Sequence, residues 1–412
     1  MKILFVIDSL YTSNNGTSVS AQRFASELVK RGHRVRALCS DRPKNGETIG
    51  SERDFVCGVL HLPIVQPLCE KHDFRYANIR KPLIRKACDW ADIVHIYVPF
   101  GISVACISYC HETGKPVTAA FHVQPENITS SLGLGKVRWA NEMLYSLFRK
   151  IAYNRVTHVH APSEFIAGQM RQRNYTAKLH VISNGIHRAF IDAGKRKRVQ
   201  ALMGQCDKND GLIRIMMIGR LSREKRQDVI IDAVRLSKYA DRIQLVFAGR
   251  GPKYEEYVAQ SRALAHAPEF VFLEREQLIE QLLKTDLYVH ASDMEIEAIS
   301  CIEAFATGLV PIIANSKESA TPQFALDERS LFEAGNPRSL AEKIDYWLDH
   351  SEERKKMEQR YADQGEKYSL KRSVNLFEQM LYAAIDDCEL SNDRTKHDAP
   401  QLKINRKKKA TA

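Results

Sequence analysis

Short apolar runs alternate with amphipathic helical patterns from the start of the chain. Residues 2–8 (KILFVID) form an apolar run, residues 18–32 (SVSAQRFASELVKRG) repeat apolar side chains at helical spacing, and residues 33–40 (HRVRALCS) form the next run. Continuous apolar runs of this length are typical of strands buried on both faces of a parallel sheet. The order strand, helix, strand therefore predicts a βαβ unit with a right-handed crossover.

The same alternation continues in two series. In the first series, further strands are predicted at residues 91–98, 116–123, 158–163 and 178–183. In the second series, strands are predicted at residues 212–222, 243–251, 270–274, 287–292 and 310–315. Helical patterns separate the strands, so we expect an α/β fold of two doubly wound, parallel-sheet domains. Ligands bind at the carboxyl ends of strands in such sheets, which predicts a site in a cleft between the domains.

A polar and basic stretch separates the two series. Because this stretch covers residues 184–200 (NGIHRAFIDAGKRKRVQ), we expect an N-terminal domain at residues 1–190 and a C-terminal domain at residues 191–365. Residues 366–387 predict a C-terminal helix that returns to the N-terminal domain. Residues 388–412 lose the apolar periodicity and end in QLKINRKKKATA, so they are expected to form a basic, disordered tail.

Composition narrows the classes of protein that remain. No apolar run among the 412 residues approaches the roughly 20 residues that cross a bilayer. The start, MKILFVIDSLYTS, is not expected to be a signal peptide, because its apolar segment is short and contains Asp8. Nine cysteines without a Cys-x-x-Cys pair indicate neither a disulfide framework nor a zinc site. A reducing, cytoplasmic location is expected.

Positive charge is concentrated in the first half of the chain. Residues 1–190 hold 25 Lys and Arg against 14 Asp and Glu, whereas residues 191–412 hold 36 of each. The formal excess of +11 therefore belongs to the N-terminal part. Such asymmetry indicates a polyanionic partner, either nucleic acid or an anionic membrane leaflet.

Two predicted strand ends in the second series carry candidate binding residues. Arg220 and Lys225, in GRLSREK, suit a diphosphate, because Arg contacts two oxygens in a fork and Lys supplies a point charge. A solvated turn explains the same residues equally well. Gly249 and Gly251 flank Arg250 after the next strand and permit close approach of a ligand to the backbone. Neither their spacing nor that of the first loop matches a dinucleotide fingerprint.

Two glutamates seven residues apart mark a third strand end. Glu295 is predicted in the loop after the strand at 287–292, and Glu303 lies in the helix that follows. The backbone N–H groups at a helix start favour an anion. Glu297 is a further acid in the loop, and solvation alone could explain it. The predicted anion-binding helix start comprises Ser300, Cys301 and Ile302.

Together these motifs resemble the retaining glycosyltransferases of the GT-B fold, family 4. The resemblance covers roughly residues 1–385 and also includes VISNGIHRAF, GRGP and EAFATGLVPII. It implies that Arg220 and Lys225 hold the diphosphate of a nucleotide-sugar donor, with Gly249 and Gly251 nearby. It further implies that Glu295 contacts the transferred sugar and Glu303 the ribose. The expected donor is UDP-glucose or UDP-galactose.

The resemblance also assigns residues of the N-terminal domain. His122 ends the strand at 116–123, where the family often places a histidine that faces the donor sugar. A histidine at a strand end is more often structural, and its agreement with the other motifs favours function here. Gly16 and Thr17 match the loop that approaches the donor phosphate and the acceptor, with Asn15-Gly16 in place of the usual Gly pair.

One departure from the family pattern points to the acceptor. Where the family usually has Gly-Phe-Gly after the first glutamate, this chain has Ile296-Glu297-Ala298. This variant is similar to members that glycosylate membrane lipids such as diacylglycerol. A second departure replaces a common Gly-Gly by residues 317–320 (KESA).

The resemblance implies a mechanism without a metal ion. The chain has no Asp-x-Asp motif, so positively charged groups are expected to stabilise the leaving diphosphate instead. The catalytic set is expected to be His122, Glu295, Arg220 and Lys225. Retention is expected to follow from front-face attack, with the leaving phosphate helping to deprotonate the acceptor. A double displacement would need a carboxylate at the anomeric carbon, for which Glu295 is the only good candidate.

Two basic, aromatic segments are candidates for membrane contact, at residues 71–90 and 135–156. Amphipathic helices of this composition can lie on anionic membranes, although surface helices often show the same pattern without any membrane. With the one-sided charge, they favour a lipid acceptor and a location at the inner face of the cell membrane. The residues expected at this surface are Arg80, Lys81, Arg85, Lys86, Arg138, Trp139, Arg149 and Lys150.

Two alternatives stay open at this point. A capsular or cell-wall polysaccharide glycosyltransferase, with a saccharide or polyprenyl-linked acceptor, would share the same donor residues. A non-catalytic nucleic-acid binder would use the basic N-terminal half. The second alternative is weaker, because no recognised nucleic-acid module is present and the aromatic residues lie in predicted helices rather than on a stacking sheet.

Overall fold

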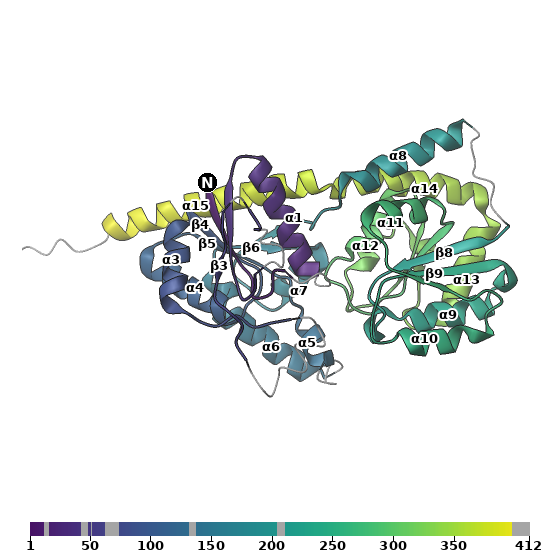
Figure 1. Ribbon diagram of the computed structural model, residues 1–412, viewed down its shortest axis with the longest axis horizontal. Coiled ribbons are helices and arrows are strands. Elements are labelled where there is room, and N and C mark those ends of the chain that lie inside the picture. The colour runs from purple at the N-terminus through teal and green to yellow at the C-terminus, as the bar shows by residue number, and fades with distance from the viewer. Residues whose placement is uncertain are drawn as a thin grey trace, which may run out of the picture.

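The computed structural model describes residues 1–11, 16–42, 48–50, 52–61, 74–131, 137–203 and 211–397. Within these ranges the chain forms two α/β domains joined by two crossovers, with a long C-terminal helix along the N-terminal domain (Figure 1). The predicted fold, with two parallel sheets, is confirmed. In the described part of the chain, no helix combines the length and the apolarity that a bilayer crossing requires.

The N-terminal domain is built on a seven-stranded sheet with the strand order β3-β2-β1-β4-β5-β6-β7. Neighbouring strands are parallel, as shown by the pairing of Ile3 with Val35 on one side and with Ile93 on the other. The strands are β1 (Lys2–Val6), β2 (Arg34–Cys39), β3 (Phe55–Val56), β4 (Ile93–Ile96), β5 (Val117–Ala120), β6 (His158–Ala161) and β7 (Lys178–Val181).

Helices cover both faces of this sheet. One face packs against α3 (Lys81–Trp90), α4 (Gly101–Thr113), α6 (Arg138–Ile151) and α7 (Glu164–Gln172), while α5 (Pro125–Ser131) precedes α6. The other face packs against α1 (Gly16–Lys30) and α15 (Leu370–His397). The sequence predicted a longer helical segment at residues 71–90. Residues 74–80 are not helical, and residues 71–73 lie outside the described residues.

The C-terminal domain has a six-stranded parallel sheet with the order β10-β9-β8-β11-β12-β13. Its strands are β8 (Ile213–Ile218), β9 (Ile243–Ala248), β10 (Glu269–Val271), β11 (Leu287–His290), β12 (Pro311–Ala314) and β13 (Leu331–Phe332). Its helices are α8 (Arg188–Leu202), α9 (Gln227–Leu236), α10 (Tyr254–Gln260), α11 (Arg275–Leu283), α12 (Ile299–Ala306), α13 (Pro337–Asp349) and α14 (Ser351–Gly365).

The two crossovers between the domains lie side by side. Ile186, in the first crossover, donates its N–H to Tyr368 O (2.8 Å) and accepts from Leu370 N (3.0 Å) in the second. Gly185 has a φ of +74°, and a Cβ there would lie 2.6 Å from the Leu370 Cα. Glycine is therefore required at this point by both the backbone conformation and the space. Phe190, the last residue of the predicted N-terminal domain, packs in the C-terminal core.

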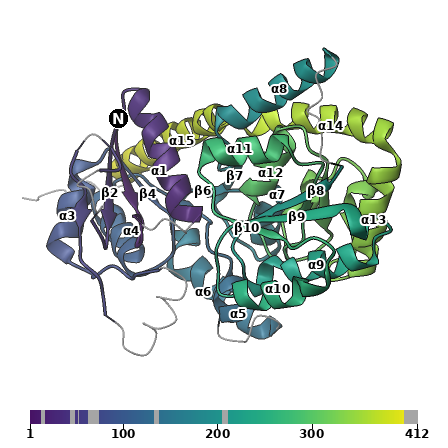
Figure 2. The same cartoon turned by 45° about the vertical axis from the view of Figure 1, so that its right-hand side comes forward.

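Helix α15 completes the N-terminal domain. Its residues Val374, Phe377 and Met380 are buried in one cluster with Phe5 and Phe24 of that domain. In both ribbon views α15 runs along the N-terminal domain, on the same side of the molecule as α14 and α8 (Figure 2). The predicted loss of structure from residue 388 is wrong for residues 388–397, which are helical. Residues 398–412 lie outside the described residues.

A local contact explains why α15 continues beyond residue 387. Asn392, in the last turns of α15, donates from Nδ2 to Gly114 O (2.9 Å) at the end of α4. Gly114 adopts a left-handed conformation with a φ of +66°. The polar composition of residues 388–397 therefore does not prevent a helix, and Asn392 links it to the folded domain.

Candidate functional site

The turn after β8 is positioned by two glycines of the next strand end. A Cβ at Gly249 would lie 2.0 Å from Gly219 O, and one at Gly251 would lie 2.2 Å from Leu221 O. Leu221 N also donates to Arg250 O (3.1 Å). The two glycines thus allow the backbone after β9 to pack closely against the turn at residues 219–221. They fix the position of Arg220, which is partly buried on this turn.

Lys225 and Glu295 meet at the carboxyl edge of the C-terminal sheet. Lys225 ends the 3-10 turn Arg223–Lys225, and its ammonium donates to Glu295 Oε1. The neighbouring Arg226 is engaged elsewhere, because its guanidinium pairs with Asp228 and Asp293. The structure therefore brings together two residues that the sequence assigned to one donor site.

Glu295 is held as an ionised carboxylate. Its Oε1 lies 3.0 Å from His290 Nε2 and also accepts from Lys225. Burial opposes ionisation, but Lys225 and His290 outweigh it and hold the pKa of Glu295 below its ordinary value. Glu295 can therefore accept hydrogen bonds at neutral pH and cannot supply a proton. His290 was not predicted as a site residue, although it lies within the predicted strand at 287–292 and ends the observed β11.

The start of α12 has a conformation that fits an anion site, but the N–H groups available to an anion differ from those expected. Ala298 precedes the helix with a φ of +67° and gives no side-chain cap. The N–H groups of Cys301 and Ile302 both bond to Ala298 O (3.0 and 3.3 Å), and both side chains lie in the core. These two amides are therefore engaged within the helix, and donor binding by Cys301 and Ile302 stays a prediction. The N–H groups of Ile299 and Ser300 come before these bonds, in the first turn of the helix, where backbone N–H groups have no acceptor within the helix.

Glu303 is covered by the other domain. It is 7% exposed, and its Oε1 lies 3.5 Å from the Arg23 guanidinium of α1. Burial raises the pKa of Glu303, against Arg23 and Arg275, which lower it. Arg23 was not predicted, because only the approach of the two domains places α1 beside α12.

Glu297 is not a solvated acid. It is 1% exposed, and its Oε2 accepts from both the backbone N (2.9 Å) and the side-chain Nδ2 (2.7 Å) of Asn184. Burial raises the pKa of Glu297 to about 7, against hydrogen bonds from Ser183 and Asn184 that lower it. The explanation by solvation is therefore wrong: this acid joins the loop before α12 to the crossover between the domains.

His122 lies at the carboxyl end of β5, as expected. It is buried and stacks on Tyr97, with ring centroids 5.4 Å apart and an interplanar angle of 12°. Its Nε2 has no hydrogen-bond partner among the described residues. Burial and the neighbouring His160 lower the pKa of His122 well below its ordinary value, so the imidazole is neutral.

The loop that follows His122 reaches the C-terminal domain. Gln124 Nε2 donates to Glu318 O (3.4 Å), and two residues later Ala320 N donates to Glu295 O (2.8 Å). The loop after β5 therefore meets a loop that is bonded to the backbone of Glu295. The other predicted residues of this domain, Gly16 and Thr17, are the first residues of α1, which starts two residues earlier than expected. Asn15 lies outside the described residues.

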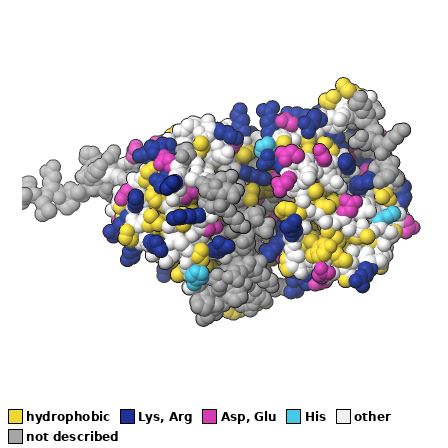
Figure 3. All heavy atoms as spheres, viewed as in Figure 1, with side chains coloured by type: hydrophobic (Ala, Val, Ile, Leu, Met, Phe, Trp, Pro, Cys, Tyr) yellow, Lys and Arg dark blue, Asp and Glu magenta, His cyan; other side chains and the backbone are white. Residues whose placement is uncertain are grey.

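The predicted membrane residues lie on two helices of the same sheet face. In α3, Lys81, Arg85 and Lys86 are exposed while Ile84 and Cys88 are buried, and Arg80 is exposed just before the helix. In α6, Arg138, Trp139 and Lys150 are exposed, whereas Arg149 donates to Arg173 O (2.7 Å). Lys and Arg side chains gather over the N-terminal domain, at the left of Figure 3.

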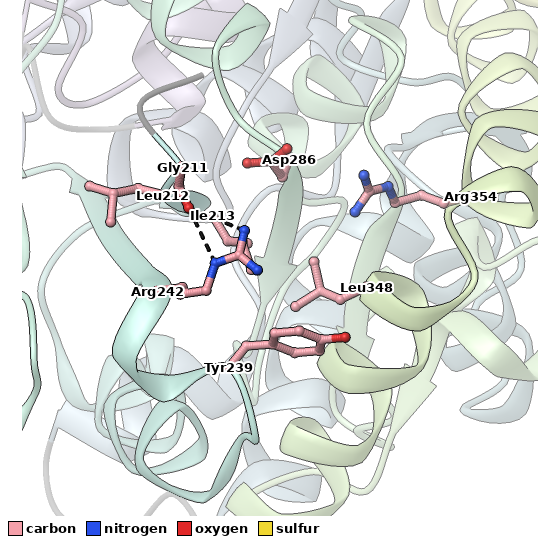
Figure 4. A pocket seen from close by; sticks show the side chains of 8 residues that line it. All are labelled: Gly211, Leu212, Ile213, Tyr239, Arg242, Asp286, Leu348 and Arg354. Atoms are coloured by element: carbon pink, nitrogen blue, oxygen red, sulfur yellow. Dashed lines mark hydrogen bonds between the residues drawn. The ribbon is translucent and has the colours of Figure 1, made fainter. Parts of the chain in front are cut away.

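A surface pocket of about 300 Å³ lies away from all of these residues. Ile213 begins β8 and Asp286 precedes β11, so the pocket is at the amino edge of the C-terminal sheet (Figure 4). Two of its polar groups bond within the protein: Arg242 donates to Gly211 O, and Asp286 Oδ2 accepts from Arg214 N (2.9 Å). The pocket does not contribute to the predicted site.

Comparison with known proteins supports the two-domain assignment. Residues 14–190 match the family described as Glycosyltransferase Family 4, and residues 199–364 match the family described as Glycosyl transferases group 1. Alpha-monoglucosyldiacylglycerol synthase from Streptococcus pneumoniae is 24% identical over 322 residues, which are 76% of this chain and 71% of that protein.

Solved structures give the same fold. HepE from Anabaena in complex with UDP has a TM-score of 0.68 at 15% identity, over 93% of this chain and 100% of that chain. The catalytic domain of cholesterol-alpha-glucosyltransferase from Helicobacter pylori is 47% identical over 38% of this chain and 99% of that chain, with a TM-score of 0.37.

These matches follow each other along the chain in the order of the two observed domains, and they confirm an enzyme over a non-catalytic binder. The chain is a glycosyltransferase of the GT-B fold, made of a family 4 domain followed by a group 1 domain.

Proposed function

We propose that this enzyme transfers a hexose from a nucleotide sugar, UDP-glucose or UDP-galactose, to a membrane lipid such as diacylglycerol or ceramide, with retention of configuration and without a metal ion. The observation that carries the proposal is the pairing of Lys225 with the ionised Glu295 beside the start of α12. A cation, a hydrogen-bond acceptor and a helix N-terminus at one strand edge suit the diphosphate and the hydroxyl groups of such a donor.

The donor exchanges partners at this site. A diphosphate that binds the ammonium of Lys225 releases the Glu295 carboxylate, which then accepts hydrogen bonds from hydroxyls of the sugar. Arg220, on the preceding turn, and the first N–H groups of α12 add positive potential where the leaving group gains charge. Stabilisation of developing charge by preorganised groups is often the largest contribution to catalysis. These groups would take the role that a metal ion has in other transferases.

The transfer step needs no protein base. The bond between the anomeric carbon and the phosphate oxygen breaks, and the acceptor oxygen bonds to the same face of that carbon. The acceptor proton passes to the leaving phosphate, so the products are an α-glycoside and a nucleoside diphosphate. Glu295 is ionised and held by two partners, which favours sugar binding over nucleophilic attack. The neutral imidazole of His122 can hydrogen-bond a sugar hydroxyl through Nε2.

The exposed side of α6 supports a lipid acceptor. Trp139, Met143 and Leu147 are 68%, 58% and 46% exposed, and their spacing of four residues places them on one side of the helix. The opposite side is buried through Tyr145 and Phe148. An apolar stripe with basic residues beside it is typical of helices that lie in a membrane interface.

Further features agree with this orientation. The basic helix α3 packs on the same face of the sheet as α6, and cationic side chains are attracted to anionic lipid headgroups. The relative from Streptococcus pneumoniae is named for a diacylglycerol glycolipid. We therefore propose peripheral binding to the cytoplasmic face of the membrane, with α3 and α6 toward the lipid.

A panel of donors and lipids tests the proposal. Purified full-length protein is incubated in EDTA with UDP- or GDP-sugars and with anionic vesicles that contain diacylglycerol, ceramide or a sterol, three lipids with a free hydroxyl at the surface. Mass spectrometry detects the product, and proton NMR gives its anomeric configuration. Glu295→Gln is run beside the wild type. An α-hexosyl lipid that is lost in the variant supports the proposal.

Other outcomes separate the alternatives. Transfer only to saccharide or polyprenyl-linked acceptors would overturn the lipid assignment and favour polysaccharide synthesis. A β-linked product would overturn retention, and activity only after a divalent metal is restored would overturn metal independence.

A further inference from the structure

The loop before α12 is held by both domains at consecutive residues. Glu295 is bonded to Lys225 and His290 of the C-terminal domain. The next residue, Ile296, accepts a hydrogen bond at its carbonyl from Ser163 Oγ (2.6 Å) of the N-terminal domain. Glu297 then accepts two hydrogen bonds from Asn184. The carboxylate assigned to the sugar therefore directly precedes two residues, one held by the N-terminal domain and one held by the crossover.

Asn184 is itself fixed on its other side. Its Oδ1 accepts from Ser20 Oγ of α1 (2.6 Å), so one amide side chain bridges α1 and Glu297. The next residues of the chain, Gly185 and Ile186, are clamped against Leu370 of the second crossover. Asn184 therefore lies where α1, both crossovers and the loop before α12 come together.

The burial of the Glu297 carboxyl at this position is energetically unfavourable. Its carboxyl is almost fully buried, and both hydrogen bonds from Asn184 fall on Oε2, so Oε1 receives none from that residue. A buried carboxyl without full compensation costs several kcal/mol in order of magnitude, and an apolar side chain would avoid that cost. Stability alone therefore does not account for an acid here. The acid supplies a directional link, because its Oε2 accepts hydrogen bonds from two N–H groups of Asn184.

We propose that Glu297 is a positioning residue, which ties the loop before α12 to Asn184 and so sets where Glu295 presents its carboxylate to the transferred sugar. This inference rests on the proposed transfer reaction. Glu297 contacts neither donor nor acceptor in this proposal. Its influence passes through two peptide units to Glu295, and a displacement of about 1 Å in a reacting group can cost about 100-fold in rate.

A cycle of variants separates positioning from general stability. Glu297→Ala is made in the wild type and in a Glu295→Ala background, and hexose transfer to lipid and UDP binding by calorimetry are measured for each. We expect Glu297→Ala to lower kcat by about 10- to 100-fold in the wild type and to change UDP affinity less than twofold. In the Glu295→Ala background, the same change should alter the residual rate less than twofold, because the residue through which it acts is gone.

Conservative and partner variants complete the test. Glu297→Gln keeps an oxygen that can accept both Asn184 donors, so it should recover most of the rate lost in Glu297→Ala. If Glu297→Ala does not fold, Asn184→Ala removes the side-chain donor and should give the same loss of kcat. Glu358→Ala is the matched control, because Glu358 is another largely buried carboxyl of this domain, on α14.

The possible failures are distinguishable. Equal losses in both Glu295 backgrounds, a similar loss in Glu358→Ala, or no recovery in Glu297→Gln would overturn the positioning role alone. A wild type that neither binds UDP nor transfers sugar would overturn the proposed function, and this inference with it.

Discussion

The carboxyl edges of the two sheets both lie where the domains meet, yet their chemistry differs. At the carboxyl edge of the C-terminal sheet, charged groups are paired with opposite charges, as in Lys225 with Glu295 and Arg226 with Asp293. At the carboxyl edge of the N-terminal sheet, burial shifts titratable groups toward their neutral forms. Burial raises the pKa of Asp8 to about 7 and, with His160, lowers the pKa of His122.

This difference teaches which half of the reaction each edge can serve. A charged edge exchanges its internal ion pairs for those of an anionic ligand, so it suits a nucleoside diphosphate. A neutral edge with unsatisfied polar atoms, such as Asp8 Oδ2 and His122 Nε2 among the described residues, suits hydroxyl groups. The donor would therefore be held by its charge on one side and by neutral hydrogen bonds on the other.

The largest expected effect comes from removing a cation of the charged edge. Lys225→Ala takes the counterion from the donor diphosphate and leaves Glu295 with His290 alone, so transfer should fall by about 100-fold or more. Initial rates with UDP-glucose and lipid vesicles measure the loss. Arg223→Ala is the control, because Arg223 is exposed on the same turn. Equal losses in the two variants would show that general turn charge, not this pair, matters.

The next effect concerns the outer face of the N-terminal domain. Replacing Trp139, Met143 and Leu147 of α6 by Ser removes the exposed apolar stripe, and vesicle binding should weaken by about 10-fold or more. Flotation with anionic vesicles measures it, and UDP affinity should not change. Leu236→Ser, which removes an exposed leucine from α9 of the C-terminal domain, should leave vesicle binding intact. Unchanged binding in the triple variant would remove α6 from the membrane interface.

A smaller effect is expected at the contact between the two edges. Arg23→Ala removes a positive charge that lowers the pKa of Glu303, so burial then favours the protonated carboxyl. A protonated Glu303 is a weaker acceptor for ribose hydroxyls, and KM for the donor should rise by about 3- to 10-fold, more at low pH. Donor titrations at constant acceptor give KM. A fall in kcat with constant KM would contradict a ribose role for Glu303.

The smallest effect is on stability. Because the pKa of Asp8 is raised by burial, the folded protein keeps a proton that the unfolded chain releases above its ordinary pKa near 4. Stability should therefore fall as the pH rises toward about 7 and level off above it, by at most about 1.4 kcal/mol per pH unit from this group. Urea unfolding between about pH 5 and 8 measures the slope, which Asp8→Asn should reduce and the exposed Asp92→Asn should not.

The pattern of apolar and polar residues predicts the strands, the helices and the residues at strand ends, because these depend on residues that are close in the sequence. The apolar runs of β8, β11 and β12 and the helix α12 place Arg220, Lys225 and Glu295 at strand ends, and all three lie there. The edge strands β3 and β13 have two residues each, too few to carry a pattern, and they were not predicted.

Contacts between the domains are not encoded in any local pattern. Glu297 is separated from Asn184 by 113 residues, and the link between them exists only when both crossovers are formed. The same holds for Arg23 and Glu303, which belong to different domains. The sequence placed Glu303 in a helix and left Glu297 to the solvent, because burial by a second domain cannot be derived from spacing.

Helix α15 has a consequence for how the chain is made. The face of the N-terminal sheet formed by Phe5 and by Phe24 of α1 is covered by Phe377 and its neighbours, from near the last residue that the structure describes. During synthesis the first domain therefore keeps an open apolar face until α15 has left the ribosome. The C-terminal domain, whose core lies between residues 186 and 361, can close earlier. The domain made first is then the last to finish folding, which exposes it to chaperones and to aggregation for the longest time.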